Sequence, residues 1–373
     1  MFKTIEKFLK DQLNRIVFIE LKKDAVIESK FNCIKEVPVP ILVNELVDPI
    51  KEKTESEDIS LASMARGMIY AIGIDSNFKY KDDYKSFLYA FHEKIEDYIC
   101  YKGIKCAEEK EFLDALIFFK ALIVVNKDNI NGLYNYAKCC QDIIHDMQDK
   151  AKIEAFEKES LEAFEILNEK FPYFAPAYYF LGFHYVNQKL YKKAQLMWVK
   201  CMELDINDEK KKECIFQLDR IKDQVQYEEG YSYVLNNQPD KGIEKLLPLV
   251  EKYSDWWNLL FFIGLAHRQL HNFIEAIEYF QKIMQHKPTQ SDTLNELGLC
   301  HASLKNFDEA EKYFNKALKY NGEDSEILSN LALVYMETGK LELAKEAFQR
   351  SIQINPDDEI TKKCIAKLES MLK

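Results

Sequence analysis

The chain has 373 residues, of which 47% are hydrophobic and 13% aromatic, with only 11 Gly and 9 Pro. This hydrophobic content suffices for a large buried core, and so few turn-forming residues are unusual in an all-β protein, so we expect mainly helices. The formal net charge of −11 argues against a dedicated nucleic-acid-binding protein, because such proteins carry a clustered excess of Lys and Arg.

The sequence also argues against a targeting or membrane-spanning segment. Residues 1–21 mix charged with apolar side chains and lack the uninterrupted apolar stretch of a signal peptide. The most apolar run, 115–125, is too short to cross a bilayer and contains Lys120. The nine cysteines are scattered, without the two-residue spacing of metal knuckles, so we expect reduced thiols in a core. We therefore expect a cytoplasmic protein with no membrane insertion.

Residues 1–58 are expected to form an N-terminal module that is mainly helical and ends in a linker. Apolar side chains at helical spacing predict a first helix that begins near Thr4. The β-branched run 16–19 could instead open a strand that pairs with residues 26–33, and the sequence alone does not separate these two interpretations. Prolines and a charged stretch then predict a connector with a short helix at 41–47.

Residues 59–95 predict a degenerate helical hairpin. Gly67 and Tyr70 show in faint form a spacing of small and large residues that returns later in the chain. A polar loop at 75–82 and an aromatic helix at 87–95 follow, as expected for the second half of such a hairpin.

From residue 96 onward one pattern of large and small apolar residues recurs, most regularly at an interval of 34 residues within 258–358. The aligned sets are Leu260, Leu294 and Leu328; Gly264, Gly298 and Ala332; Ala276, Ala310 and Ala344; and Phe280, Phe314 and Phe348. A fixed period of this length, with small residues in phase with large ones, predicts helical hairpins stacked in an array. We assign seven units, 96–129, 130–174, 175–208, 223–256, 257–290, 291–324 and 325–358.

Two insertions and an end segment depart from the period. Residues 145–159 keep helical spacing, so we expect the second unit to be a longer hairpin. Residues 209–222 predict an inserted helix that runs directly into the next unit. Residues 359–373 carry one apolar stripe against a lysine-rich back, which is typical of a C-terminal capping helix.

The repeated pattern resembles the tetratricopeptide repeat (TPR) family, whose signature is large-x-x-Leu-Gly-x-x-Tyr followed by Ala-x-x-x-Phe, Ala and Pro. The resemblance covers residues 96–373. Some positions depart from the signature, since Cys106, His267 and His301 replace the Tyr and Ala137 and Ala332 replace the Gly. The resemblance implies an all-α fold: a right-handed α-solenoid of antiparallel hairpins, the TPR superhelix. The structure of the small N-terminal region remains open.

Family members typically bind a peptide or a helix of another protein in a concave groove lined by the first helix of each hairpin. The residues that this rule places in a groove are Tyr134, Lys138, Tyr179, Phe183, Tyr227, Tyr231, Phe261, Leu265, Arg268 and Asn295. Aromatic side chains are densest in the middle units, and such residues dominate binding hot spots. The alternative is that the aromatic rings pack on neighbouring hairpins.

The sequence contains no glycine-rich phosphate loop, nucleophile elbow or metalloprotease helix. His267 and His271 are spaced to share a helix face, but one occupies a packing phase and the other an expected turn. We therefore expect no enzyme, no cofactor and no metal. The leading hypothesis is a non-catalytic scaffold that binds a protein or peptide, not nucleic acid. The alternative is a peptide-sensing regulatory receptor, similar to bacterial receptors with such repeats, that acts on a protein partner. The oligomeric state stays open.

Overall fold

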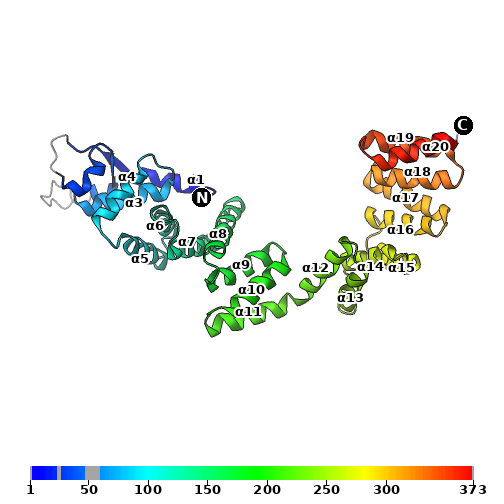
Figure 1. Cartoon of the computed structure of the whole chain (residues 1–373), viewed down its shortest axis with the longest axis horizontal. Helices are drawn as coiled ribbons and strands as arrows, with labels where there is room; N and C mark the ends of the chain where they lie inside the picture. The colour runs from blue at the N-terminus through cyan, green and yellow to red at the C-terminus, as the bar shows by residue number, and fades with distance from the viewer. Residues whose placement is uncertain (1, 23–26, 47–58, 372–373) are drawn as a thin grey trace. The chain divides into compact units, whose positions relative to one another are not determined.

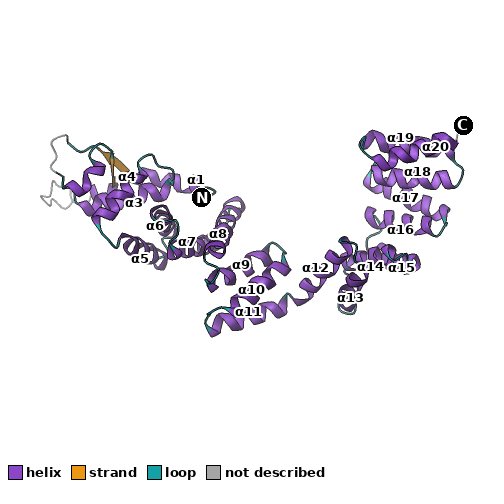
Figure 2. Ribbon diagram, in the orientation of Figure 1, coloured by secondary structure: helices purple, strands orange, loops and turns teal. Residues whose placement is uncertain are grey.

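The computed structural model describes residues 2–22, 27–46 and 59–371, which are mainly helical (Figures 1 and 2). They form two compact units, of which unit 1 ends at Gln217 and unit 2 begins at Leu218. The predicted all-α solenoid of stacked helical hairpins is confirmed. The boundary between the units falls inside the expected insertion 209–222.

The N-terminal module is built around a two-stranded antiparallel sheet. α1 (Glu6–Leu9) continues as a 3₁₀ helix to Arg15, and β1 (Ile16–Ile19) then pairs with β2 (Val39–Leu42). The strand interpretation of residues 16–19 is therefore correct, but the expected partner, 26–33, is wrong.

The partner strand lies in the expected connector and includes Pro40, which pairs with Phe18. Proline lacks an N–H, and a two-stranded sheet tolerates it because both of its strands are edge strands. Of the short helix expected at 41–47, only residues 43–46 are helical, and residue 47 lies outside the described residues.

Helix α3 (Leu61–Ile74) packs mainly on β2 and on α6 (Phe112–Val125), and less on α4 (Lys81–Phe91). The predicted hairpin at 59–95 is therefore not a regular pair of helices. Gly67 explains the close packing, because an added Cβ there would overlap the backbone carbonyl of Pro40.

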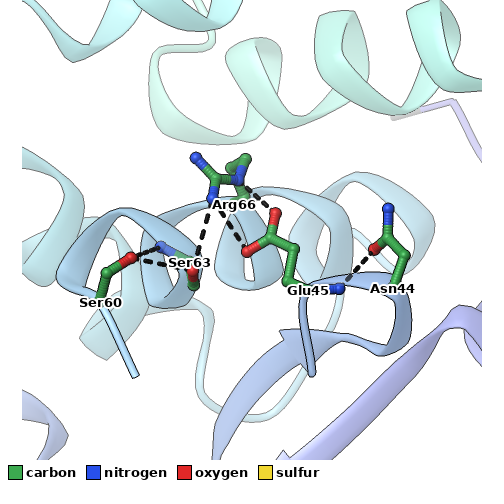
Figure 3. A network of polar contacts seen from close by, with 5 residues as sticks. All are labelled: Asn44, Glu45, Ser60, Ser63 and Arg66. Atoms are coloured by element: carbon green, nitrogen blue, oxygen red, sulfur yellow. Dashed lines mark hydrogen bonds and ion pairs between the residues drawn. The ribbon is translucent and has the colours of Figure 1, made fainter. Parts of the chain in front are cut away.

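The start of α3 is tied to the segment after β2 by the polar network of Figure 3. Ser60 caps the helix by accepting a hydrogen bond from the Ser63 N–H at 3.0 Å. Arg66 binds Glu45 through two parallel hydrogen bonds, one of them 2.9 Å long. This bidentate geometry fixes the N-terminal module against α3.

Three hairpins follow in unit 1, and then a single helix that contains the boundary between the two units. The hairpins are α5 (Ile95–Glu108) with α6, α7 (Ile130–Ile143) with α8 (Lys150–Lys170), and α9 (Ala175–Asn187) with α10 (Tyr191–Glu203); the single helix is α11 (Asp208–Arg220). The 21 residues of α8 accommodate the insertion at 145–159 within a longer hairpin.

Unit 2 contains four hairpins and a terminal helix. They are α12 (Lys222–Leu235) with α13 (Pro239–Leu246), α14 (Trp257–Gln269) with α15 (Phe273–His286), α16 (Ser291–Ser303) with α17 (Phe307–Asn321), and α18 (Ser325–Glu337) with α19 (Leu341–Ile354), followed by α20 (Glu359–Met371). Pro248 lies in the 3₁₀ turn that ends α13, as expected for a residue that cannot donate to the helix ladder. In the part of the chain that the structure describes, no helix has the length and apolarity to span a membrane.

The turn inside the hairpins has one recurring backbone geometry in every described hairpin except α7–α8. A single residue adopts a positive φ between the two helices, and these residues are Lys110, Lys189, Asn237, His271, Lys305 and Gly339. At Lys305, two hydrogen bonds of 2.9 Å close the end of α16, from its own N–H to Ala302 and from Asn306 to His301. The last three positions of the set are spaced by 34 residues, so the backbone shows the same period as the side chains.

Helix α6 is buried on several sides, which explains why its sequence is the most apolar run of the chain. It packs against α3, α5 and α7, and Lys120 on it is only 1% exposed. The Nζ of Lys120 lies 2.8 Å from Glu6 Oε1, so the N-terminal module supplies the counter-charge. Glu159 accepts hydrogen bonds from the Thr4 N–H and the Tyr136 hydroxyl and anchors the same module to α8.

Candidate functional site

A cavity of about 420 Å³ lies between α5, α6 and α7 in unit 1. Its lining contains two of the residues predicted for a groove, Tyr134 and Lys138. The other lining residues are Ile104, Ala107, Glu108, Phe119, Asn135, Cys139 and Asp142. The cavity therefore combines apolar side chains with a few polar groups, which is the composition of many ligand-binding sites.

Two of the charged residues of this cavity form an ion pair with each other, and the third forms none in the described part of the chain. Lys138 Nζ lies 2.6 Å from Asp142 Oδ2, one helical turn along α7, so these two charges compensate each other. Glu108 is exposed at the end of α5 and forms no ion pair among the described residues. The lining thus carries two carboxylates and one ammonium group, and Glu108 provides the excess negative charge.

Tyr134 is held in place by three phenylalanine rings. The centroid of its ring lies 5.5 Å from that of Phe174, 6.1 Å from that of Phe180 and 6.4 Å from that of Phe164. Burial raises the pKa of its hydroxyl, so this group remains neutral at physiological pH. Tyr134 therefore offers a rigid aromatic wall to the cavity and also packs on the next hairpin.

The structure does not leave Tyr179 open for binding. Its side chain is buried because α11 covers it, with the hydroxyl donating to Glu213 and Lys210 lying 5.0 Å from its ring centroid. Phe183, one turn along α9, is half-buried and packs edge-on against Trp198. The prediction of Tyr179 as an accessible groove residue is wrong, since α11 occupies the space in front of it.

In unit 2, Tyr227 and Tyr231 of α12 belong to one aromatic cluster. The ring of Tyr227 lies 4.2 Å from that of Trp256, and the ring of Tyr231 stacks on Phe262 at 5.3 Å. Both tyrosines remain half-buried. Part of each ring therefore packs on neighbouring aromatic residues, as the alternative interpretation expected, and the rest of each side chain is accessible.

The remaining predicted residues follow α14 and α16. Phe261 and Leu265 are half-buried, and the ring centroid of Phe261 lies 5.8 Å from that of Phe280. Arg268 forms an ion pair with Glu296, whose pKa is raised by burial despite this partner. Asn295 is 9% exposed and accepts a hydrogen bond from Asn330, so it connects α16 to α18.

Sequence reasoning missed several residues that shape these surfaces. Trp256 and Phe262 complete the aromatic cluster of unit 2, and Glu108 and Asp142 give the cavity of unit 1 its charge. Phe262 follows directly after the predicted Phe261, so neighbouring positions on the same helix were the available signal. Within residues 2–22, 27–46 and 59–371, no group of three His, Cys, Asp or Glu side chains could hold a metal ion.

Comparisons with known proteins find similarity to family models and to solved structures of tetratricopeptide repeat proteins. Two tetratricopeptide repeat models match residues 257–323 and 302–368. No curated protein sequence matches the chain. A tetratricopeptide repeat protein from Parabacteroides merdae is 10% identical, with a TM-score of 0.38 over 73% of this chain and 98% of that one. A chain in the crystal structure of the APC/C hetero-tetramer Cut9–Hcn1 is 16% identical in sequence, with a TM-score of 0.42 over 87% of this chain and 66% of that one.

Proposed function

We propose that the chain is a non-catalytic scaffold that binds a peptide or helix of a protein partner, as the match of residues 257–323 and 302–368 to tetratricopeptide repeat models suggests. The observation that supports this proposal is the cavity of unit 1, where Ile104, Tyr134 and Lys138 meet. Solenoids of helical hairpins use extended concave surfaces for binding, and the first helices α5 and α7 supply most of this lining.

The lining suggests how a partner segment would bind. Ile104, Ala107 and Phe119 offer an apolar surface for one buried side chain of the partner. Asn135 and the Lys138–Asp142 pair lie beside it and can exchange hydrogen bonds with a peptide backbone. The accessible parts of Tyr227, Tyr231 and Phe261 in unit 2 form a second candidate surface.

The test compares partner capture by the intact protein and by Ile104→Glu. Ile104 is 38% exposed, so the substitution adds a charge to the cavity without emptying the core. Leu196→Glu is the matched control, because Leu196 is 52% exposed on α10 and does not line the cavity. Proteins captured from native cells are quantified by mass spectrometry, and peptides that tile each candidate are then titrated by fluorescence anisotropy.

We expect Ile104→Glu to weaken the tightest peptide at least tenfold, the equivalent of about 1.4 kcal/mol. Leu196→Glu should bind like the intact protein. Equal affinity of Ile104→Glu and the intact protein, with unchanged helical circular dichroism, would remove the cavity as the binding site. Capture that is then lost in Tyr231→Ala would transfer the site to unit 2.

A second candidate function is a peptide-sensing receptor that acts on a protein partner, and the contacts of α7 favour it. On one side of α7, Tyr134 and Lys138 line the cavity. Tyr136 of the same helix packs against Phe2 of the N-terminal module, with ring centroids 4.9 Å apart. A peptide that displaces α7 would therefore alter the packing of the module.

Hydrogen exchange of residues 2–22 with and without the captured peptide separates the two functions. A change in protection of this segment supports the receptor. Unchanged protection at saturating peptide leaves the scaffold as the function.

A further inference from the structure

A second cavity in unit 1 has no role in the function proposed above. It has a volume of about 300 Å³ and lies where the turn after α3, the start of α4 and helix α6 meet. Its lining combines apolar and charged side chains, namely Phe2, Ser76, Asn77, Lys81, Asp82, Lys85, Lys120, Ile123 and Val124. The volume is at the lower end of the range for ligand sites, so it suits a small molecule better than a peptide.

The charges of this cavity are unevenly compensated. Lys120 is paired with Glu6, which also accepts a hydrogen bond of 2.6 Å from the Ser76 hydroxyl. The nearby Asp75 accepts the backbone N–H of Asn77 at 2.9 Å. Glu6 therefore compensates Lys120, and Lys81 and Lys85 are the lysines of the lining left to interact with a ligand.

Lys81 and Lys85 stand one turn apart on α4, and among the described residues neither forms an ion pair. Like charges at this spacing on a helix repel each other. The one carboxylate in the lining, Asp82, balances only one of the two ammonium groups. An anion in the cavity would compensate the other and gain charge-assisted hydrogen bonds.

The apolar part of the lining restricts the ligand further. Phe2, Ile123 and Val124 supply apolar surface to the lining, and Ser76 and Asn77 supply polar groups. We propose that this cavity binds a small anion that carries a carboxylate or phosphate group, with Lys81 and Lys85 as its cationic contacts. A short apolar chain on that anion would pack against the apolar surface.

The experiment titrates the full-length protein with inorganic phosphate and, separately, with butyrate, by isothermal calorimetry at constant ionic strength. The test variant is Lys81→Gln with Lys85→Gln, which replaces each lysine with a polar side chain one atom shorter and removes its charge. Lys158→Gln is the matched control, because Lys158 is exposed on α8 and does not line the cavity. Lys81→Arg with Lys85→Arg tests whether positive charge alone restores binding.

We expect saturable binding of at least one of the two anions, weakened tenfold or more in the double glutamine variant and kept in the control and in the arginine variant. Saturation by phosphate alone would identify a phosphate ligand, and saturation by butyrate alone a carboxylate with an apolar tail. Absence of saturable binding of both anions at tens of millimolar would overturn the proposal. Equal binding by the intact protein and the glutamine variant, both with native circular dichroism, would overturn it as well.

Discussion

Replacing Gly298 with Ala tests the close contact between the two helices of a hairpin. Gly298 of α16 faces the ring of Phe314 on α17, and an added Cβ would lie 2.5 Å from its Cε1 atom. The same arrangement recurs at Gly264, where the nearest ring atom of Phe280 would be 2.7 Å away. Carbon atoms prefer a separation of about 3.5 to 4.0 Å, so the ring must move by roughly 1 Å.

Two opposing effects set the magnitude of the change. Overpacking a well-filled core costs about 1 to 3 kcal/mol. Alanine is preferred over glycine inside a helix by about 1 kcal/mol, which offsets part of this cost. We therefore expect Gly298→Ala to destabilise unit 2 by up to about 2 kcal/mol, although it is the substitution that helix propensity alone would favour.

The assay is urea unfolding of the full chain, followed by the fluorescence of Trp256 and Trp257, which both lie in unit 2. Phe314→Leu, alone and combined with Gly298→Ala, completes a double-mutant cycle. If the added methyl group collides with the ring, the combined variant loses less stability than the sum of the two single variants. Greater stability of Gly298→Ala than of the intact protein would refute the packing argument.

Gly132→Ala is a control with a milder contact. An added Cβ at Gly132 would lie 3.0 Å from Leu122, whose flexible side chain can move aside. We expect this variant to be close to neutral, because the helix preference of alanine and the small rearrangement nearly cancel.

Three further predictions address a pH dependence, a strained turn and a buried ion pair. Burial lowers the pKa of His184 to about 4, and charging this residue therefore favours the unfolded chain. Lowering the pH from 7 to 5 should reduce the free energy of unfolding by about 2 kcal/mol through this residue. In urea unfolding at the two pH values, His184→Gln should lose less stability than the intact protein, and equal losses would contradict the assignment. Lys305 has a φ of +62°, a backbone conformation that strains any residue other than glycine. Lys305→Gly should therefore stabilise unit 2 by about 1 kcal/mol in urea unfolding. Destabilisation would show that the contacts of the Lys305 side chain contribute more than the backbone strain costs. Lys120→Met should lower the free energy of unfolding by about 3 kcal/mol, because it leaves the carboxylate of Glu6 without its partner. Adding Glu6→Gln removes that unpaired charge and should recover part of the loss in urea unfolding. No recovery would mean that the loss comes from packing and not from charge.

The sequence predicted the repeats well because each repeat is specified locally. Gly298, Ala310 and Phe314 meet within one hairpin, and the same contacts return 34 residues away, so a short pattern contains the packing information. The positive φ at the hairpin turn was not predicted, because lysine, asparagine and histidine occupy it in most units and only Gly339 shows the usual sequence signal.

The N-terminal module could not be predicted in the same way, because its structure depends on distant residues. Residues 16–19 become a strand by pairing with residues that include Pro40, which the sequence marks as a strand breaker. Lys120 lies in the most apolar run of the chain, and its buried state depends on Glu6, which is 114 residues away. Contacts of this kind leave no periodic trace in the sequence.

The residues predicted for binding fall into two sets, and α11 shows why they should be tested separately. Glu213 of α11 binds Tyr179, which lies 34 residues earlier, so α11 shields this residue of α9. Helix α20 has an equivalent role in unit 2, where Thr361 shares a hydrogen bond of 2.8 Å with Ser329 of α18. In both cases a helix that is not part of a hairpin contacts the first helix of the hairpin before it, α9 in one case and α18 in the other. The accessible residues among those predicted for binding therefore precede these helices, with Tyr134 and Lys138 before α11 and the aromatic residues of α12 and α14 before α20.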